Sequence, residues 1–379
     1  MILLEQGPGG LPALFAQPQS LIVAWQPEEV DAAFAAMAAA QKAGFWLAGY
    51  ASYELGYALE PRLRHLMPPQ PQTQKRVPLL AFEVHHAPTC ATDFLASIDA
   101  DTTPVHFANP APDWSAAQYA TAFERLQHYI AQGDCYQANL TFSMRARTTA
   151  TPQSLYAALR RMQPVPFGAW LDMGVGPVVL SRSPELFFRL DSSGKIEARP
   201  MKGTMPRHPD PAQDAALAAS LKNSAKNRAE NIMIVDLLRN DMGRLCEIGS
   251  VQVPELFNVQ SYATVHQMIS RVLGQSRPGL SLSDLFRALF PCGSVTGAPK
   301  IRAMEIIREL EPAPRGVYCG SIGWIAPDGS AELNVAIRTL SLFDNGEVLM
   351  NVGGGVVYDS TAAAEYEEAL WKARFAHLG

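Results

Sequence analysis

Cysteine, charge and long apolar runs are all scarce in this sequence of 379 residues. The five cysteines are odd in number, widely spaced and never arranged as Cys-x-x-Cys, which argues against a disulfide framework and a zinc site. Charged residues make up only 18%, and the formal net charge of -5 argues against a nucleic-acid-binding surface, which needs a basic face. We therefore expect reduced thiols in a cytoplasmic protein with no nucleic-acid partner.

Membrane segments are not expected either. The apolar stretch at residues 45–59 is interrupted by Glu54, and no other run is long enough to cross a bilayer. The first residues have neither a basic start nor a long apolar run, so we expect no secretory signal. Hydrophobic residues nevertheless make up 48% of the chain, enough for a packed core in two or three ordinary domains or one large domain.

Prolines mark one candidate domain boundary. Pro104, Pro110 and Pro112 lie within residues 99–114, and proline removes a backbone donor and disfavours helix at the residue before it. We therefore place a boundary near residue 113, between a short N-terminal α/β subdomain (1–113) and a catalytic domain (114–379). The larger part is rich in Gly, Arg, Glu and Asn in turn-like contexts, so the N-terminal part is expected to be a reduced, regulatory one.

The pattern of the larger part predicts an α+β fold. A helix is expected from Ser115, with Gln118 completing a capping box and Gly133 beyond its end. Further helices are expected over 210–239 and 362–376, and strands over 137–144, 178–181 and 185–190. Asp-Gly at 328–329 and Asn-Gly at 345–346 separate alternating apolar runs, which predicts two hairpins. Antiparallel hairpins flanked by helices favour α+β over a regular βαβ alternation.

Carboxylates near the C-terminus suggest a cation site. Glu365, Glu368 and Lys372 lie at i, i+3 and i+7 and so share one helix face. Two carboxylates one turn apart suit Mg²⁺, although a solvated face with one Glu–Lys pair explains the same pattern. Glu230 lies among interleaved apolar and polar residues, and the sequence leaves open whether it is a ligand or part of an ion-pair network.

Lys202 is the candidate nucleophile, in a loop before Gly203. A lysine has an ordinary pKa of about 10.4, so it needs burial or a cationic neighbour, for which Arg199 is a candidate. A solvated charge is the alternative. Arg338 is expected inside a strand, where a guanidinium suits a carboxylate, though a structural salt bridge explains it nearly as well.

Glycine-rich segments provide candidate backbone sites. Residues 353–355 are three glycines after a strand, which either bring N–H groups to an anion or form a bulge. The loop at 291–300 lacks the G-x-x-x-x-G-K-[ST] spacing of a phosphate loop, so we expect no nucleotide site there.

Taken together, these segments resemble the chorismate-utilising enzymes over residues 115–379. The resemblance is carried by Gly133-Asp134-Cys135-Tyr136-Gln137-Ala138-Asn139-Leu140-Thr141, Ser181-Arg182-Ser183-Pro184-Glu185, Arg199-Pro200-Met201-Lys202-Gly203-Thr204, Ala229-Glu230-Asn231, residues 293–300, Tyr318-Cys319-Gly320, Ile337-Arg338-Thr339, Gly353-Gly354-Gly355 and Glu365-Tyr366-Glu367-Glu368. It implies a large antiparallel β-sheet sandwich flanked by helices, with a reduced N-terminal part. Leu3-Leu4-Glu5 resembles the start of a tryptophan-binding motif of longer members, but Gln6 departs from it.

Among the reactions of this family, Pro-x-Lys-Gly-Thr is typical of the members that aminate chorismate at C4. Pro200 to Thr204 matches it, so the resemblance implies that chemistry, for p-aminobenzoate and folate biosynthesis. Synthesis of anthranilate, isochorismate or salicylate from the same substrate is the alternative, and Lys202 argues against it. A non-catalytic chorismate-binding regulatory subunit is a further alternative, and the retained Glu185, Lys202, Glu230 and Glu368 argue against that.

The resemblance also implies a role for each site residue. Lys202 would be the nucleophile and Glu185 the general acid. Glu230 and Glu368 would bind Mg²⁺, with Glu365 nearby. Ammonia is implied as the second substrate, supplied by a glutamine amidotransferase subunit. The candidate substrate-binding residues are Thr296, Gly297, Tyr318, Arg338, Gly353, Gly354, Gly355, Lys372 and His266, although a histidine in such a run is more often packed than catalytic.

Overall fold

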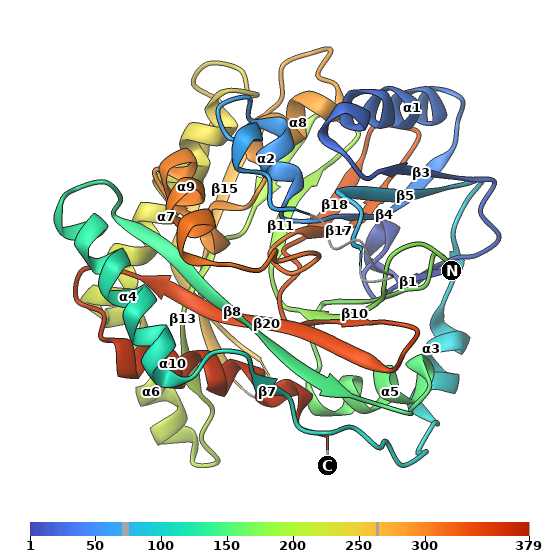
Figure 1. The fold of residues 1–379 in the computed structure, drawn as a ribbon. Coiled ribbons are helices and arrows are strands. Elements are labelled where there is room, and N and C mark those ends of the chain that lie inside the picture. The colour runs from blue at the N-terminus through green and yellow to red at the C-terminus, as the bar shows by residue number, and fades with distance from the viewer. Residues whose placement is uncertain (70–75, 263–264, 379) are drawn as a thin grey trace.

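Two large antiparallel sheets dominate the fold. The structure is a computed structural model that describes residues 1–69, 76–262 and 265–378. Within these residues the strands form two ten-stranded sheets, and helices flank both of them (Figure 1). The predicted α+β class, with large antiparallel sheets flanked by helices, is confirmed.

The first sheet contains the long crossing strands at the centre of Figure 1. Its order is β16-β8-β20-β19-β10-β9-β1-β2-β6, with β7 beside β8. The strands are β16 (Gly297–Ala298), β8 (Gln137–Arg147), β20 (Glu347–Val356), β19 (Thr339–Leu342), β10 (Val178–Ser183), β9 (Phe167–Leu171), β1 (Ile2–Leu4), β2 (Ala13–Phe15), β6 (Thr89–Cys90) and β7 (Ala111–Pro112).

The second sheet lies behind and above the first in Figure 1. Its order is β13-β15-β12-β11-β18-β17-β4-β5-β3, with β14 beside β15. The strands are β13 (Met201–Pro206), β15 (Val265–Gln275), β12 (Lys195–Ala198), β11 (Leu186–Leu190), β18 (Ala331–Asn334), β17 (Ser321–Ile325), β4 (Trp46–Ala51), β5 (Leu80–His85), β3 (Ser20–Ala24) and β14 (Gln252–Ser261). The two predicted hairpin turns join β17 to β18 and β19 to β20.

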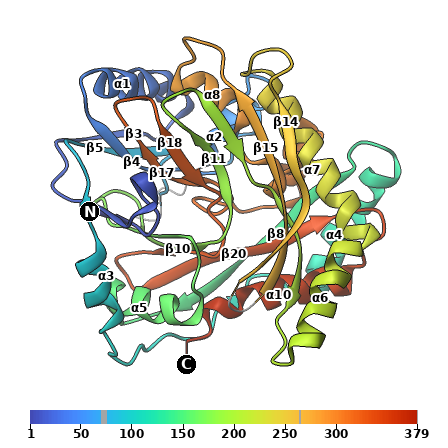
Figure 2. The same cartoon turned by 180° about the vertical axis from the view of Figure 1, so that it is seen from behind.

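Helices cover the ends and outer faces of the sheets. In Figure 2, α6 and α7 run along the edge of the second sheet that holds β13, β14 and β15. The helices are α1 (Val30–Lys42), α2 (Leu55–Leu59), α3 (Thr92–Asp99), α4 (Ala116–Ala131), α5 (Pro152–Met162), α6 (Pro211–Asn223), α7 (Ala225–Gly243), α8 (Leu282–Leu289), α9 (Lys300–Leu310) and α10 (Ala362–Lys372). Short 3₁₀ turns occur at Pro8–Gly10, Pro27–Glu29, Arg64–Leu66, Gly293–Val295 and Ala373–Ala376. No helix among the described residues is long and apolar enough to span a bilayer.

Two of the predicted helices differ from the expected ranges. The segment 210–239 forms two helices separated by Ser224, because the Ser224 side chain accepts a hydrogen bond from the Asn227 N–H and so caps the start of α7 at Ala225. The C-terminal helix α10 ends at Lys372 and continues only as a 3₁₀ turn. The helix predicted from Ser115 forms with its capping box, and Gly133 follows it with φ +82°.

The larger buried cluster packs helices against the sheets, with Phe34 of α1 and Phe123 of α4 among its members, and a smaller one joins the two sheets. Ile2 and Val179 of the first sheet and Tyr50 and Ile322 of the second are at most 1% exposed and belong to one buried cluster. Each sheet takes strands from both sides of residue 113, since β1 pairs with β9 and β4 pairs with β17. The division of the chain at residue 113 stays a prediction.

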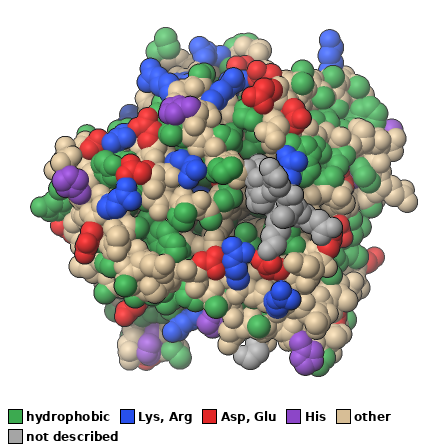
Figure 3. Space-filling view, viewed as in Figure 1, with side chains coloured by type: hydrophobic (Ala, Val, Ile, Leu, Met, Phe, Trp, Pro, Cys, Tyr) green, Lys and Arg blue, Asp and Glu red, His purple; other side chains and the backbone are tan. Residues whose placement is uncertain are grey.

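Charges on the surface are mixed. On the face drawn in Figure 3, Lys and Arg side chains are interspersed with Asp and Glu side chains, and no large area carries one sign. This agrees with the modest net charge of -5.

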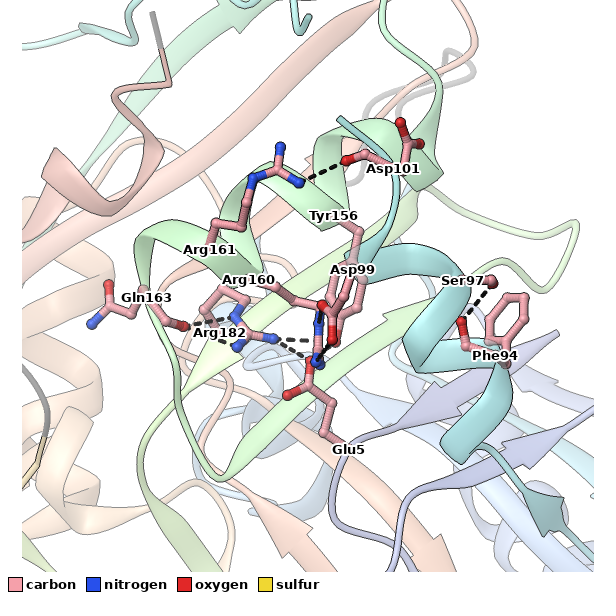
Figure 4. Close-up of polar contacts among 10 residues, drawn as sticks. All are labelled: Glu5, Phe94, Ser97, Asp99, Asp101, Tyr156, Arg160, Arg161, Gln163 and Arg182. Atoms are coloured by element: carbon pink, nitrogen blue, oxygen red, sulfur yellow. Dashed lines mark hydrogen bonds and ion pairs between the residues drawn. The ribbon is translucent and has the colours of Figure 1, made fainter. Parts of the chain in front are cut away.

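A buried ion-pair network ties β1 to β10 and α5 (Figure 4). Arg182 of β10 is 1% exposed; its guanidinium donates to the Glu5 carboxylate and to the Gln163 carbonyl oxygen. Tyr156 donates its hydroxyl hydrogen to Glu5 at 2.6 Å, and Arg160 pairs with Glu5 as well. Glu5 is therefore the shared anion of two arginines from different elements.

Glu5→Gln is expected to lower the free energy of unfolding by about 3–5 kcal/mol, because it leaves the buried Arg182 without its carboxylate partner. Urea unfolding followed by circular dichroism measures this. Glu28→Gln, at an exposed position, is the matched control and should change stability by less than about 0.5 kcal/mol. An equal effect of both substitutions would contradict a structural role for the network.

Candidate active site

Most of the predicted site residues line one pocket of about 460 Å³ between the ends of the two sheets. The pocket is closed on one side by α7 and on another by α10. Of the predicted residues, its lining includes Glu185, Lys202, Glu230, Tyr318, Arg338, Gly353, Gly355, Glu365, Glu368 and Lys372. Segments more than 150 residues apart in the sequence therefore meet at one site, as the residue numbers of this lining show.

Lys202 lies in the edge strand β13 and not in a loop as expected. The pairing of β13 with β15 shifts register between Met201 and Thr204, and Gly203 there has φ +83°. Such a bulge re-aims side chains, and a glycine tolerates the left-handed backbone that it requires. The sequence could not give this bulge, because a Lys-Gly pair is equally compatible with an ordinary turn.

Burial lowers the pKa of Lys202 below its ordinary value; Glu230 opposes this shift and the cation of Lys372 adds to it. The expectation that Arg199 is the cationic neighbour of Lys202 is wrong, because the Arg199 guanidinium donates to Glu197 at 2.6 Å. A buried amine with a lowered pKa is more often neutral, which a nucleophile requires.

Glu185 lies between β10 and β11 and is 4% exposed. Its backbone is held on both sides, since its N–H donates to Ser183 Oγ and its carbonyl oxygen accepts from the Val335 N–H. The Ser294 hydroxyl donates to its Oε1 at 2.7 Å. Burial raises the pKa of Glu185 to about 7, against the opposing effects of Ser294 and Lys202. A carboxyl group with this pKa can hold a proton near neutral pH and give it up.

Arg338 lies in the connection between β18 and β19, not inside a strand as expected. Its φ is +52°, in the left-handed region that a non-glycine residue rarely adopts. The Arg182 N–H donates to its carbonyl oxygen at 2.9 Å, which helps to hold this backbone. Burial lowers the pKa of Arg338 to about 10, with Glu185 opposing the shift. Strained residues held by their surroundings are common at binding sites, which favours a role for Arg338 in holding an anion.

The candidate cation ligands come from two helices. Glu230 lies on α7, and Glu365 and Glu368 lie on α10. Aromatic rings attach α10 to its neighbours: Tyr366 stacks on Phe142 of β8 and lies against Tyr119 of α4. The position of the two α10 carboxylates is therefore fixed by core packing.

The carboxylates differ in their immediate partners. Ser360 donates to Glu365 Oε1 at 2.6 Å, and burial raises the pKa of Glu365. Burial also opposes ionisation of Glu368, but Lys372, whose Nζ lies 2.8 Å from Glu368 Oε1, lowers the pKa of Glu368 below its ordinary value. No cluster of three or more His, Cys, Asp or Glu side chains in the described part of the chain forms a complete metal site by itself.

The glycine run lies inside β20, not after a strand, and brings backbone close to these groups. A Cβ on Gly354 would stand 2.9 Å from Glu365 Oε2, 3.4 Å from Lys372 Nζ and 4.0 Å from Glu368 Oε1. A Cβ on Gly355 would stand 2.8 Å from Gln137 Nε2 and 3.1 Å from Lys202 Nζ. Glycine thus leaves room for the α10 side chains at Gly354 and for Gln137 and Lys202 at Gly355.

Four predicted substrate-binding residues are absent from the pocket lining: Gly354, which lies beside the α10 carboxylates, and Thr296, Gly297 and His266. Thr296 is fully buried, and its hydroxyl donates to the Cys292 carbonyl oxygen. Gly297 of β16 pairs with Ala138 of β8. His266 is 1% exposed, and its ring nitrogens lie 2.8 Å from Ser261 Oγ and 2.9 Å from Asp214 Oδ1. A histidine whose two ring nitrogens are both hydrogen-bonded has a structural role, as is more common for a histidine in such a run.

Several pocket residues were given no role by the sequence. Asn139, Lys226, Asn227, Gln267 and Ser294 line the pocket. Gln137 is fully buried beside Gly355, and neither end of its side-chain amide has a hydrogen-bond partner. Gln137, Asn139, Thr141 and Ser143 alternate along the buried strand β8, and polar residues at every second position of an internal strand are a signal that could have found the first two.

The comparisons with known proteins identify the family of the chain. The sequence profile of the chorismate binding enzymes matches residues 1–377, and the chain belongs to that family. Aminodeoxychorismate synthase component 1 of Escherichia coli (strain K12) is 47% identical over 264 residues, which cover 69% of this chain and 58% of that protein. The matched part thus spans under two thirds of that relative's length.

Relatives with another name are nearly as similar. Anthranilate synthase component 1 of Streptomyces coelicolor is 42% identical over 265 residues, covering 69% of this chain and 52% of that protein. The crystal structure of anthranilate synthase component I from Streptococcus pneumoniae has a TM-score of 0.73 at 29% identity, covering 87% of this chain and 80% of that one. Overall similarity therefore gives the family and the fold, and the choice of reaction depends on individual residues.

Proposed function

We propose that this chain aminates chorismate at C4 to give 4-amino-4-deoxychorismate, the reaction of aminodeoxychorismate synthase. One observation carries the proposal: the amine of Lys202 and the carboxyl group of Glu185 face the same pocket as the carboxylates on α7 and α10. The name of the Escherichia coli relative supports it.

The proposed reaction has two displacements. The neutral amine of Lys202 attacks C2, both conjugated ring double bonds shift, and the C4–O bond breaks while Glu185 donates its proton, so that water leaves. Ammonia then attacks C4, both double bonds shift back, and the C2–N bond breaks as the lysine nitrogen departs. The surplus proton of the incoming ammonia returns to the carboxylate of Glu185. Replacing one difficult displacement by two easier ones is the usual gain of covalent catalysis.

Mg²⁺ fits the donor set of the pocket. Glu230 and Glu368 would bind it, with Glu365 through a water molecule, and hard carboxylate oxygens completed by water and substrate are what Mg²⁺ prefers. The space beside Gly354, which a Cβ would narrow to 2.9 Å from Glu365, is consistent with that arrangement. When bound, the ion would neutralise a carboxylate of the substrate.

The remaining residues would hold the anionic substrate. Arg338, Tyr318 and the backbone of residues 353–355 are proposed to hold a second carboxylate, with Lys372 beside them. Thr296 and Gly297 would support the pocket wall from behind Ser294 and Val295. This division of roles follows the family resemblance and the shared pocket lining.

The nitrogen source would be a separate glutamine amidotransferase subunit, because the relative is named as component 1. The product would then supply p-aminobenzoate for folate biosynthesis in the cytoplasm. Residues 1–113 are proposed as a reduced, regulatory part.

Product identification tests the proposal. The purified chain is incubated with chorismate and excess ammonium salt at mildly alkaline pH, with and without Mg²⁺, and the products are identified by mass spectrometry. We expect a Mg²⁺-dependent product that keeps the enolpyruvyl group and carries an amine in place of the hydroxyl, and that a lyase converts to p-aminobenzoate. Anthranilate, salicylate or an isomer of unchanged mass would overturn the proposed reaction.

Gly354→Ala is expected to weaken Mg²⁺ binding about tenfold, because the added methyl group displaces the Glu365 carboxylate. Isothermal titration with Mg²⁺ measures it. Gly243→Ala is the control, since a Cβ at that position would meet nothing within 4 Å. Identical titrations of both variants and the unsubstituted chain would argue against a cation site at α10.

A further inference from the structure

Each of the two proposed metal-binding helices carries a lysine one turn from a proposed ligand. The lysine follows the carboxylate on α10 and precedes it on α7. On α10, Lys372 Nζ lies 2.8 Å from Glu368 Oε1 and also donates to the Gly353 carbonyl oxygen at 3.0 Å. On α7, Lys226 Nζ lies 3.9 Å from Glu230 Oε1. Both lysines line the pocket. The carboxylates proposed for Mg²⁺ thus already have cationic partners.

The formal charges of the pocket balance. Among its described lining residues, the four cations Lys202, Lys226, Arg338 and Lys372 face the four carboxylates Glu185, Glu230, Glu365 and Glu368. Chorismate carries two carboxylates and Mg²⁺ two positive charges. Either one alone would leave two uncompensated charges in a partly buried site, which is costly, whereas both together preserve the balance.

Lys372 cannot keep its present contact once a dication binds Glu368, because two cations would then share one carboxylate at close range. Its side chain has a flexible four-carbon stem and is 35% exposed, so the ammonium group has room to move. Lys226 is 56% exposed and its contact is longer, so it is displaced more easily. Both ammonium groups would remain at the pocket, available to an anion.

We propose that Lys226 and Lys372 are exchangeable counter-ions, which Mg²⁺ displaces from Glu230 and Glu368 and which the dianionic substrate then takes up. This proposal rests on the proposed function for the identity of the dianion. Its consequence is that metal and substrate each strengthen the binding of the other, because each provides the charges that the other displaces.

Equilibrium titrations test the exchange. Mg²⁺ affinity is measured calorimetrically for the unsubstituted chain, Lys372→Met and Lys226→Met, with and without 4-deoxychorismate, which keeps both carboxylates but has no hydroxyl to lose. Lys195→Met, at an exposed position outside the pocket lining, is the matched control. We expect the analogue to tighten Mg²⁺ binding roughly 5- to 150-fold in the unsubstituted chain.

Removing a lysine should act in opposite ways in the two conditions. Without the analogue, Lys372→Met should bind Mg²⁺ about two- to fivefold more tightly, because a competing cation is gone, and Lys226→Met should show a smaller gain. With the analogue, the coupling should be smaller in Lys372→Met than in the unsubstituted chain, because one of the two exchanged cations is gone.

Two results would overturn the exchange: unchanged or weaker Mg²⁺ binding by Lys372→Met alone, or an undiminished coupling. The Mg²⁺ titration without the analogue tests the lysine–metal exchange independently of the substrate. Failure of the analogue to bind any of the proteins would instead count against the proposed function.

Discussion

Lys202→Ala is expected to reduce the rate of amination roughly 10³-fold or more while the fold is retained. The amine is the proposed nucleophile, and loss of a group that forms a covalent bond removes the whole two-step route. The side chain projects into the pocket from an edge strand, so its truncation leaves little of the core disturbed. The measurement is the steady-state rate with chorismate, Mg²⁺ and ammonium.

Lys202→Arg separates the two functions that the amine could have. Arginine keeps the positive charge facing Glu185 and Glu230 but stays protonated, so it cannot act as a nucleophile near neutral pH. Both variants should therefore be inactive if the role is covalent, whereas a purely electrostatic role would leave Lys202→Arg substantially active.

A mass measurement on the intact protein completes this test. In the absence of ammonium, the unsubstituted chain should gain the mass of chorismate less one water, and digestion should locate the addition at Lys202. Turnover by Lys202→Ala at the unsubstituted rate, or an adduct on another residue, would remove Lys202 from the mechanism.

Glu185→Gln is expected to lower kcat about 10²- to 10⁴-fold, the usual contribution of a positioned general acid. The pKa of Glu185 is about 7 because of burial, so the fraction that holds a transferable proton falls as the pH rises through 7. Lys202 must be neutral, so its contribution grows as the pH rises through its own lowered pKa. The pH profile of kcat should therefore be bell-shaped, and its two apparent pKa values belong to Glu185 and Lys202 as an interacting pair.

Two substitutions should alter this profile in different ways. Glu185→Gln should lose the fall at high pH, since no ionising carboxyl remains. Ser294→Ala should move the pH optimum to higher pH, because the hydroxyl that donates to Glu185 at 2.7 Å holds the pKa of the carboxyl down. A profile that is the same in all three proteins would show that Glu185 donates no proton in the rate-limiting step.

Local sequence signals predicted the elements well. The two hairpins turn where Asp328-Gly329 and Asn345-Gly346 indicate, because the glycine of each pair adopts the left-handed backbone that the turn requires. The helix break at Ser224 was missed, since a serine inside an otherwise helical pattern reads as a tolerated residue until its side chain is seen to cap the next helix.

The assembly of the site could be predicted only in part. The resemblance identified the residues that would act, but composition and spacing could not say that Lys372, and not Arg199, would be the cation near Lys202. That choice depends on α10 and β13 meeting across β20, which is a property of tertiary packing. The strained backbone of Arg338 and the buried amide of Gln137 are likewise set by neighbours distant in the sequence.

The mixing of early and late strands in both sheets has a consequence for synthesis on the ribosome. Ala51 of β4 pairs with Ser321 of β17, and Thr141 of β8 pairs with Gly353 of β20, so neither sheet can close until nearly all of these residues have emerged. Pairings of such long range slow folding and leave strand edges open to association while the chain waits. The nascent protein therefore depends on protection of its apolar strands during translation more than a chain of consecutive, self-contained domains would.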